Sequence, residues 1–299
     1  MACCRTRLAL SRGRDDETVD AILTFEDRYS TAPQPFAEWA LAQLDLSAVT
    51  AVADVGCGDG RFALPLARQL VGRQAATREP FEVIGIDQRA PALAALDMAA
   101  KQNGLPIRTV SGDAREGSLV LDDSLDLVMC NFLLHLMSRP AIQACLGNVR
   151  GWLRHEGSLV IAGYGSDHMS ACVDWLREAL TEVGLSSEAA NQLADRQRRS
   201  GPRSFVLEDG IKRLSPAFSV VTYRGFEDTL VVGVDDLAEL TLPSMIGSRA
   251  LTRDVGVSQQ QLGDALVRVM QAAAQNGMLR VDTDLGILVA SRPRRTEEA

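Results

Sequence analysis

The sequence predicts an α/β fold in which a doubly wound, mostly parallel sheet carries helices on both faces. Three observations lead to this prediction. Short apolar runs alternate with segments of helical periodicity through the first half of the chain. The helical segments have the length of crossover connections between parallel strands. Such crossovers are right-handed, so helices are expected on both sides of the sheet.

In the first half, strands are expected at residues 50–55, 81–86, 106–110, 125–130 and 158–162. Helices are expected between them at residues 61–70, 91–102 and 139–153. Pro91 and Pro140 suit the first turns of two of these helices, and Ser138 is a suitable N-cap for the last. Residues 72–80 (GRQAATREP) are expected to form a surface loop.

The second half has a different pattern, with helices expected at residues 167–183, 187–199, 235–246 and 258–275. Two β-like runs flank Gly225, and residues 278–290 suit a closing hairpin or a long strand. The helices between about 233 and 277 are expected as a cap inserted before the last strand. Flexible tails are expected at residues 1–18 and 291–299. They enclose a single domain over 19–290, with a cofactor half at about 28–163 and a substrate half at about 164–290.

Composition excludes several classes of protein. The chain has 299 residues, of which 46% are hydrophobic and 23% charged, and this excludes global disorder. No run approaches the roughly 20 apolar residues of a membrane-spanning helix. The net charge of -8 disfavours general nucleic-acid binding, because an acidic chain gains nothing from releasing phosphate counterions. Neither a membrane nor a nucleic acid is therefore expected as a partner.

The cysteines and the N-terminus indicate a cytoplasmic location. The 6 cysteines are scattered, without a CxxC pair or zinc-type spacing, and are expected to be reduced and mostly buried. Residues 1–14 contain only Leu8-Ala9-Leu10 as an apolar stretch, which is too short for a secretory signal.

The most informative segment is residues 52–62 (VADVGCGDGRF), which follows an expected strand and opens an expected helix. It contains three glycines, Gly56, Gly58 and Gly60. Glycines permit a tight turn and close approach of the backbone to a ligand, and the helix start adds free N–H groups. A dinucleotide site would need a glycine where Arg61 stands, and Asp54 would repel a pyrophosphate. The turn therefore favours a nucleoside that carries an amino acid.

Acidic and polar residues follow the next strands, at the edge where open α/β sheets bind ligands. Asp87, followed by Gln88, ends the second strand and can accept both hydroxyls of a ribose. Asp113, followed by Ala114, comes after the third strand and can accept a hydrogen bond from an adenine amino group. Asn131 follows the fourth strand. Each has a structural alternative, because carboxylates also cap loops or helices and asparagine is a common turn residue.

The order of these segments resembles that of class I S-adenosylmethionine-dependent methyltransferases. The resemblance is carried by DVGCGDG, GID, SGDA and SLDLVMCNFLLHL in turn, over about residues 28–163. It implies a Rossmann-like, seven-stranded sheet whose last strand is antiparallel. It also implies S-adenosylmethionine as the cofactor, with S-adenosylhomocysteine as its product.

The resemblance also implies roles for single residues. The three glycines would hold the methionine and ribose portions, Asp54 the methionine amino group and Asp87 the ribose hydroxyls. Asp113 and the Ala114 backbone would read the adenine. Asn131 would line the sulfonium side, and Tyr29 would cover the cofactor, although ordinary packing is an equal alternative for Tyr29.

The acceptor side of the site requires fewer specific catalytic groups than the cofactor side requires binding groups. Methyl transfer from a sulfonium is an in-line displacement, so much of the rate can come from alignment and desolvation. His135 follows the fourth strand, and Tyr164 and His168 follow the fifth. These three are candidate bases or acceptor contacts, with packed, hydrogen-bonded side chains as the alternative. No metal is expected, because Asn131 and Tyr164 stand where metal-dependent catechol methylation needs clustered carboxylates.

The sequence thus favours methyl transfer to a small molecule in biosynthesis, for example of a secondary metabolite. The acidic charge and the capping helices suit a small metabolite better than a polymer. The methylated atom stays open between oxygen, nitrogen and carbon, and so does the oligomeric state. The alternative is a protein that binds S-adenosylmethionine without methylating, as a cyclase or a regulatory partner. Arg61 disfavours an NAD-dependent oxidoreductase.

Overall fold

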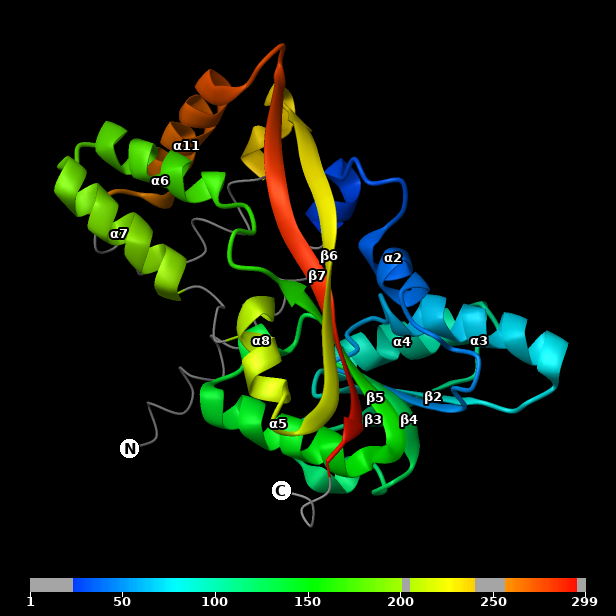
Figure 1. Ribbon diagram of the computed structural model, residues 1–299. Helices are drawn as coiled ribbons and strands as arrows, with labels where there is room; N and C mark the ends of the chain where they lie inside the picture. Colours follow the sequence, from blue (N-terminus) through cyan, green and yellow to red (C-terminus); the bar gives the residue numbers. More distant parts are fainter. Residues whose placement is uncertain (1–23, 201–204, 240–255, 295–299) are drawn as a thin grey trace. The chain divides into compact units, whose positions relative to one another are not determined.

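The computed structural model describes residues 24–200, 205–239 and 256–294 (Figure 1). The chain divides into two compact units. Of the described residues, the sheet unit comprises 34–166, 205–226 and 284–294, and the helical unit comprises 24–33, 167–200, 227–239 and 256–283. Two long strands, β6 (Phe218–Gly233) and β7 (Met278–Pro293), supply residues to both units. The predicted domain bounds stay a prediction, and the tail expected at residues 1–18 lies outside the described residues.

Seven strands form one sheet in the order β3-β2-β1-β4-β5-β7-β6. The strands of the first half are β1 (Ala51–Val55), β2 (Glu82–Asp87), β3 (Ile107–Ser111), β4 (Leu125–Met129) and β5 (Leu153–Tyr164). They pair in parallel, whereas β7 pairs with β5 in antiparallel register. The predicted doubly wound, mostly parallel fold with an antiparallel last strand is confirmed. The strand order reverses between β1 and β4, where α/β sheets bind ligands at their carboxyl ends.

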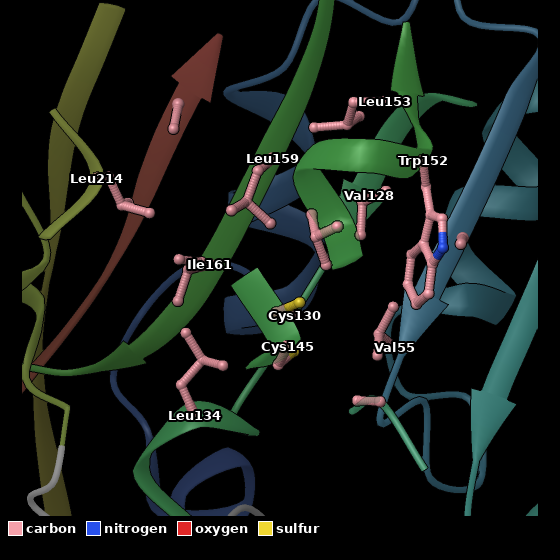
Figure 2. Packing of buried hydrophobic residues seen from close by; sticks show 14 of the residues in the cluster. Val55, Val128, Cys130, Leu134, Cys145, Trp152, Leu153, Leu159, Ile161 and Leu214 are labelled. Carbon is pink, nitrogen blue, oxygen red and sulfur yellow. The ribbon is translucent and has the colours of Figure 1, made fainter. Parts of the chain in front are cut away.

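Helices pack on both faces of the sheet, because successive strand residues point to opposite sides. On one face, α5 (Arg139–Trp152) and α8 (Leu207–Leu214) cover a buried apolar layer that includes Val128 and Ile161. Figure 2 shows this layer, with Trp152 beside the strands. Gly85 of β2 faces the other way, and Leu96 of α4 (Ala90–Gln102) fills the space beside it.

Four segments of the sheet unit differ from the prediction. Residues 72–80 are not a loop throughout, because α3 (Ala63–Thr77) continues through their alanines and glutamine and ends before Arg78 at φ 63°. Strand β5 begins at Leu153 instead of 158, with a register shift opposite its start. Two short helices were not predicted, α2 (Phe36–Ala42) and α8.

The long strands also differ from the prediction. The two β-like runs around Gly225 form one continuous strand, β6, and the segment from Met278 is one long strand, not a hairpin. Strand β7 continues to Pro293, so residues 291–293 are not part of a tail.

The helical unit has its own apolar core. Helices α6 (Ala171–Glu182), α7 (Ser187–Ser200) and α11 (Gln259–Ala273) surround it, together with parts of β6 and β7. Helix α6 begins later than the expected residue 167, whereas the other two helices are confirmed. Of the helix expected at 235–246, η3 (Val234–Asp236) and the buried Leu237 are described, and residues 240–246 lie outside the described residues. No helix in the described part of the chain is both long and apolar enough to cross a membrane.

Candidate active site

The turn after β1 adopts a backbone that only glycine accommodates easily. Gly56, Gly58 and Gly60 have φ angles of 72°, 55° and 100°. A Cβ atom on Gly56 would lie 2.8 Å from Leu133, and one on Gly60 would lie 2.5 Å from Leu96. The N–H groups of Gly56 and Cys57 donate to the carbonyl of Ile86 at 2.7 and 3.0 Å. The turn is therefore folded closely against the end of β2.

Asp87 fixes the opposite side of this turn. Its Oδ2 accepts a hydrogen bond of 2.9 Å from the N–H of Gly58, and its Oδ1 accepts one of 2.8 Å from the N–H of Arg89. The side chain is buried, and Gln88 beside it is exposed. Nε of Arg89 also lies 3.5 Å from Oδ1 in an ion pair, whereas Oδ2 retains a further lone pair with which Asp87 can accept a hydroxyl group of a ligand.

Asp54 and Asn131 form a buried polar pair beside the turn. The Nδ2 of Asn131 donates to Oδ1 of Asp54 at 3.3 Å, and the residues are 7% and 1% exposed. Burial raises the pKa of Asp54 to about 7, although the Asn131 hydrogen bond acts to lower it. The buried Oδ1 of Asn131 accepts no hydrogen bond from the described residues. A cationic donor, such as the ammonium group of an amino acid, fits this set of oxygens.

Asp113 lies at the same edge of the sheet, because the N–H of Gly112 donates to the carbonyl of Asp87 at 3.1 Å. Its carboxylate is already engaged by Arg115, whose N–H and Nε donate at 3.0 and 2.8 Å and whose guanidinium forms an ion pair with it. A ligand would therefore share Asp113 with Arg115, a partner that the sequence pattern does not reveal. Ala114 is buried.

Aromatic rings lie at the ends of β4 and β5. The ring centroid of Phe132 is 5.0 Å from that of Tyr164 and 6.5 Å from that of His135. The rings of His135 and Tyr164 are 5.2 Å apart. His135 lies in the short helix η2 (Leu134–Leu136) and is buried. The structure thus brings His135 and Tyr164 together beside Phe132, the residue that follows Asn131 in the sequence.

Two predicted site residues belong to the helical unit. The hydroxyl of Tyr29 lies 3.4 Å from Oε2 of Glu239, and burial raises its pKa. Nε2 of His168 lies 3.1 Å from Oε1 of the buried Glu26. The roles expected for Tyr29 at the cofactor and for His168 at the acceptor stay predictions.

The side chains that could bind a metal ion are dispersed in the described part of the chain. They contain no group of three or more His, Cys, Asp or Glu side chains positioned to hold a metal ion. The described cysteines are free and buried, and they are Cys57, Cys130, Cys145 and Cys172.

Comparison with known proteins agrees with this geometry. Residues 52–157 match a family model described as a methyltransferase domain. The YcgJ protein from Bacillus subtilis is similar in structure, with a TM-score of 0.53 at 15% identity over 87% of this chain and 98% of that one. A putative methyltransferase from Bacillus halodurans C-125 has a TM-score of 0.55 at 14% identity over 87% and 100% of the two chains. No curated protein matches the chain.

The structural likeness supports the fold, and the family match supports the chemistry of the region that contains the glycine turn, Asp87, Asp113 and Asn131. The oxygens of Asp54 and Asn131 suit the amino group of an adenosyl amino acid. Residues 52–157 are therefore similar to a methyltransferase domain, a type of domain that uses S-adenosylmethionine as its cofactor.

Proposed function

We propose that the protein transfers the methyl group of S-adenosylmethionine to a small-molecule acceptor, as a step in the biosynthesis of a secondary metabolite. The buried pair of Asp54 and Asn131 is the observation that carries this proposal. A carboxylate and an amide oxygen beside a glycine turn form a site for an ammonium group that belongs to an adenosyl compound.

The other cofactor contacts follow the sheet edge. The glycine turn lies against the methionine and ribose portions, and Asp87 and the neighbouring Gln88 hold the ribose. Asp113 and the Ala114 backbone contact the adenine. Asn131 lines the sulfonium side, and Tyr29 covers the cofactor. These contacts are supported by the common edge that the ends of β1, β2, β3 and β4 share.

The reaction proposed for this site is an in-line displacement. When bound, the cofactor supplies a methyl group on a positively charged sulfur, which becomes neutral as the methyl group leaves. The chain contributes alignment of the acceptor and exclusion of water, which together account for much of the barrier reduction in such reactions. His135, Tyr164 and His168 contact the acceptor or take its proton, and no metal ion takes part.

A small acceptor is supported by the charge of the chain. The net charge of -8 disfavours binding of polyanions, and therefore nucleic acid as the acceptor. The free cysteines support a location in the cytoplasm, where thiols stay reduced.

Binding of S-adenosylhomocysteine tests the proposed cofactor site. Titration calorimetry on the full chain is expected to show binding that Asp87→Ala and Gly58→Val weaken at least tenfold, while circular dichroism stays unchanged. Glu82→Gln, on the same strand but in an exposed ion pair with Arg108, is the control and is expected to bind normally. Unchanged binding in both site variants would contradict the assignment.

Methyl transfer itself needs a separate measurement. Isotope-labelled S-adenosylmethionine is incubated with the chain and a mixture of small metabolites, and the label is followed by mass spectrometry. Label in a product supports the proposal. Tight cofactor binding without any label transfer would favour the alternative, a protein that uses the cofactor as a scaffold for cyclisation or as a regulatory ligand.

A further inference from the structure

Arg89 is a charged residue of the sheet unit that borders Asp87 and has no part in the cofactor contacts proposed so far. It comes two residues after Asp87 and is the N-cap of helix α4. Residues usually found at an N-cap accept hydrogen bonds from the helix start, whereas an arginine side chain has only donors. Its side chain is 27% exposed. The position of Arg89 therefore calls for a purpose other than helix capping.

The backbone and the side chain of Arg89 both face one oxygen of Asp87. The N-cap is extended, with φ and ψ of -92° and 106°, and its N–H donates to Oδ1 of Asp87 at 2.8 Å. A hydrogen bond of this kind, from the residue two positions on, is a turn that aspartate commonly forms. Nε of Arg89 lies 3.5 Å from the same oxygen. A ligand hydroxyl would have to compete with both donors for Oδ1.

The second oxygen of Asp87 can take a ligand. Oδ2 accepts the N–H of Gly58 at 2.9 Å, and a carboxylate oxygen has a further lone pair. A ribose offers two neighbouring hydroxyls, and a carboxylate that accepts both of them needs an available lone pair on each oxygen. The surroundings of Asp87 thus favour one hydroxyl at Oδ2 over two hydroxyls at once.

The guanidinium of Arg89 supplies a donor near this oxygen. A Cβ atom added at Gly58 would lie 3.4 Å from Nη2 of Arg89. The N–H of Gly58 itself donates to Oδ2 of Asp87, so the donor Nη2 and the acceptor Oδ2 border the same glycine. A guanidinium has five N–H donors in a rigid fork. Nε can therefore face Asp87 while Nη2 serves another oxygen.

The charge of Arg89 also reaches the glycine turn. Burial raises the pKa of the Cys57 thiol, and the charges of Asp54 and Asp87 raise it further, whereas Arg89 acts to lower it. The guanidinium thus offsets part of the negative charge that the two carboxylates place at the turn. A sugar hydroxyl at this place meets a donor and an acceptor of opposite charge.

We infer that the two ribose hydroxyls of the cofactor are divided between Asp87 and Arg89. One hydroxyl donates to Oδ2 of Asp87, and the oxygen of the other accepts a hydrogen bond from the guanidinium of Arg89. Arg89 is thereby a specificity-determining residue, because one ribose position must carry a donor and the other needs only an acceptor. This inference rests on the proposed function, since it adds a contact to the same cofactor site.

The competing arrangement leaves the ribose to Asp87 alone. Arg89 would then turn away, and the carboxylate would accept both hydroxyls. In that case both hydroxyls depend on the same residue and make the same kind of contact. In the divided arrangement each hydroxyl depends on a different residue, so variants of Asp87 and Arg89 distinguish the two arrangements.

The first test uses the full chain with S-adenosylhomocysteine and its 2′-deoxy and 3′-deoxy analogues. Titration calorimetry measures the three affinities for the wild type, Asp87→Asn and Arg89→Met. Methionine keeps the apolar stem of arginine without its donors. In the wild type, each missing hydroxyl is expected to weaken binding about tenfold or more, because each removes a hydrogen bond to a charged group.

The variants are expected to give a crossed pattern. In Arg89→Met, removal of one hydroxyl should cost less than about threefold, while removal of the other still costs about tenfold. In Asp87→Asn, the two hydroxyls should exchange these behaviours. Equal costs for the two hydroxyls within each variant overturn the inference, and so does a result in which only one of the two variants changes the costs.

Arg108→Met is the matched control. Arg108 also pairs with a carboxylate of β2, that of Glu82 at 2.9 Å, but both side chains are exposed. This variant is expected to leave all three affinities unchanged. A merely structural role of Arg89 would weaken all three ligands by the same factor in Arg89→Met, and that outcome contradicts the inference.

A second measurement needs only the wild type, so it does not depend on the folding of a variant. The 2′-O-methyl and 3′-O-methyl analogues of S-adenosylhomocysteine keep both oxygens as acceptors and each loses one hydroxyl donor. Methylation of the hydroxyl at Asp87 should weaken binding about tenfold or more, as removal of that hydroxyl does. Methylation of the other should cost clearly less than its removal, because its oxygen still accepts from the partly exposed Arg89. Equal weakening by the two methyl groups overturns the inference.

The outcomes keep the two proposals apart. If S-adenosylhomocysteine binds but the costs of the two hydroxyls do not cross, the division of the ribose is wrong and the proposed function stands. If S-adenosylhomocysteine itself does not bind to the wild type, the proposed function fails first.

Discussion

The side-chain amide of Asn131 donates a 3.3 Å hydrogen bond to the carboxylate of Asp54, and both side chains are buried. The bond links the ends of β4 and β1, two neighbouring strands whose order reverses at this place. Burial of the carboxylate outweighs its hydrogen bonds from the Asn131 side chain and the Ala63 backbone, and the pKa of Asp54 accordingly rises to about 7. Asp54 is therefore only partly ionised near neutral pH in the ligand-free chain.

Cofactor affinity is expected to depend on pH through Asp54. Its proposed ligand is an ammonium group, which needs the ionised carboxylate, so protonation below about pH 7 competes with binding. The affinity for S-adenosylhomocysteine should fall about tenfold per pH unit below this value and level off above it. Calorimetry between about pH 5.5 and pH 8.5 measures this slope. Asp54→Asn should bind weakly at every pH without the slope, and a slope that survives in this variant would rule out Asp54 as its source.

The stability of the ligand-free chain should change with pH in the opposite sense. The pKa of Asp54 is higher in the native state than the value of about 3.9 in an unfolded chain, so the native state holds this proton more tightly. Its contribution is fully present below about pH 4 and is lost as the pH rises to about 7. The loss amounts to about 4 kcal/mol at most. Urea titrations of the wild type and Asp54→Asn should show stabilities that diverge in favour of the variant over this range.

The sequence was sufficient to predict the sheet and the edge at which its polar strand ends meet, because these signals are local. Each of β1 to β4 is a short apolar run, and the polar residues that end them meet because parallel strands end together. Asp87, at the end of β2, is an example: its position follows from the length of one strand.

The remaining features depend on contacts between distant segments. Helix α8 contains Gly210, which lowers helical propensity, and it forms because Leu207 and Leu214 are buried against the sheet. The contact of Phe132 with Tyr164 depends on a positive φ that no pattern predicts. The ion pair of Arg115 with Asp113 is local, but carboxylate–arginine pairs are too common for their spacing to identify it.

Metal removal is expected to leave the reaction unchanged. Asn131 and Tyr164 end the strands where a metal-dependent enzyme of this fold would need carboxylates, and Asn131 is already bonded to Asp54. Dialysis against EDTA, followed by the labelled-methyl assay, should give the same rate with and without added Mg²⁺. A rate that disappears with EDTA and returns with Mg²⁺ would show that a metal takes part after all.

The glycine turn gives a test of backbone strain in which the chain supplies its own control. Gly60 and Gly104 both have positive φ angles, of 100° and 64°. An added Cβ would lie 2.5 Å from the buried Leu96 at Gly60, whereas Gly104 has no atom within 4 Å of such a Cβ. Gly104→Ala should therefore cost only the backbone strain, about 1 kcal/mol, and Gly60→Ala about 2–3 kcal/mol because Leu96 must move as well. Denaturant midpoints of the two variants measure the difference, and equal losses would mean that the turn has room for a side chain at Gly60.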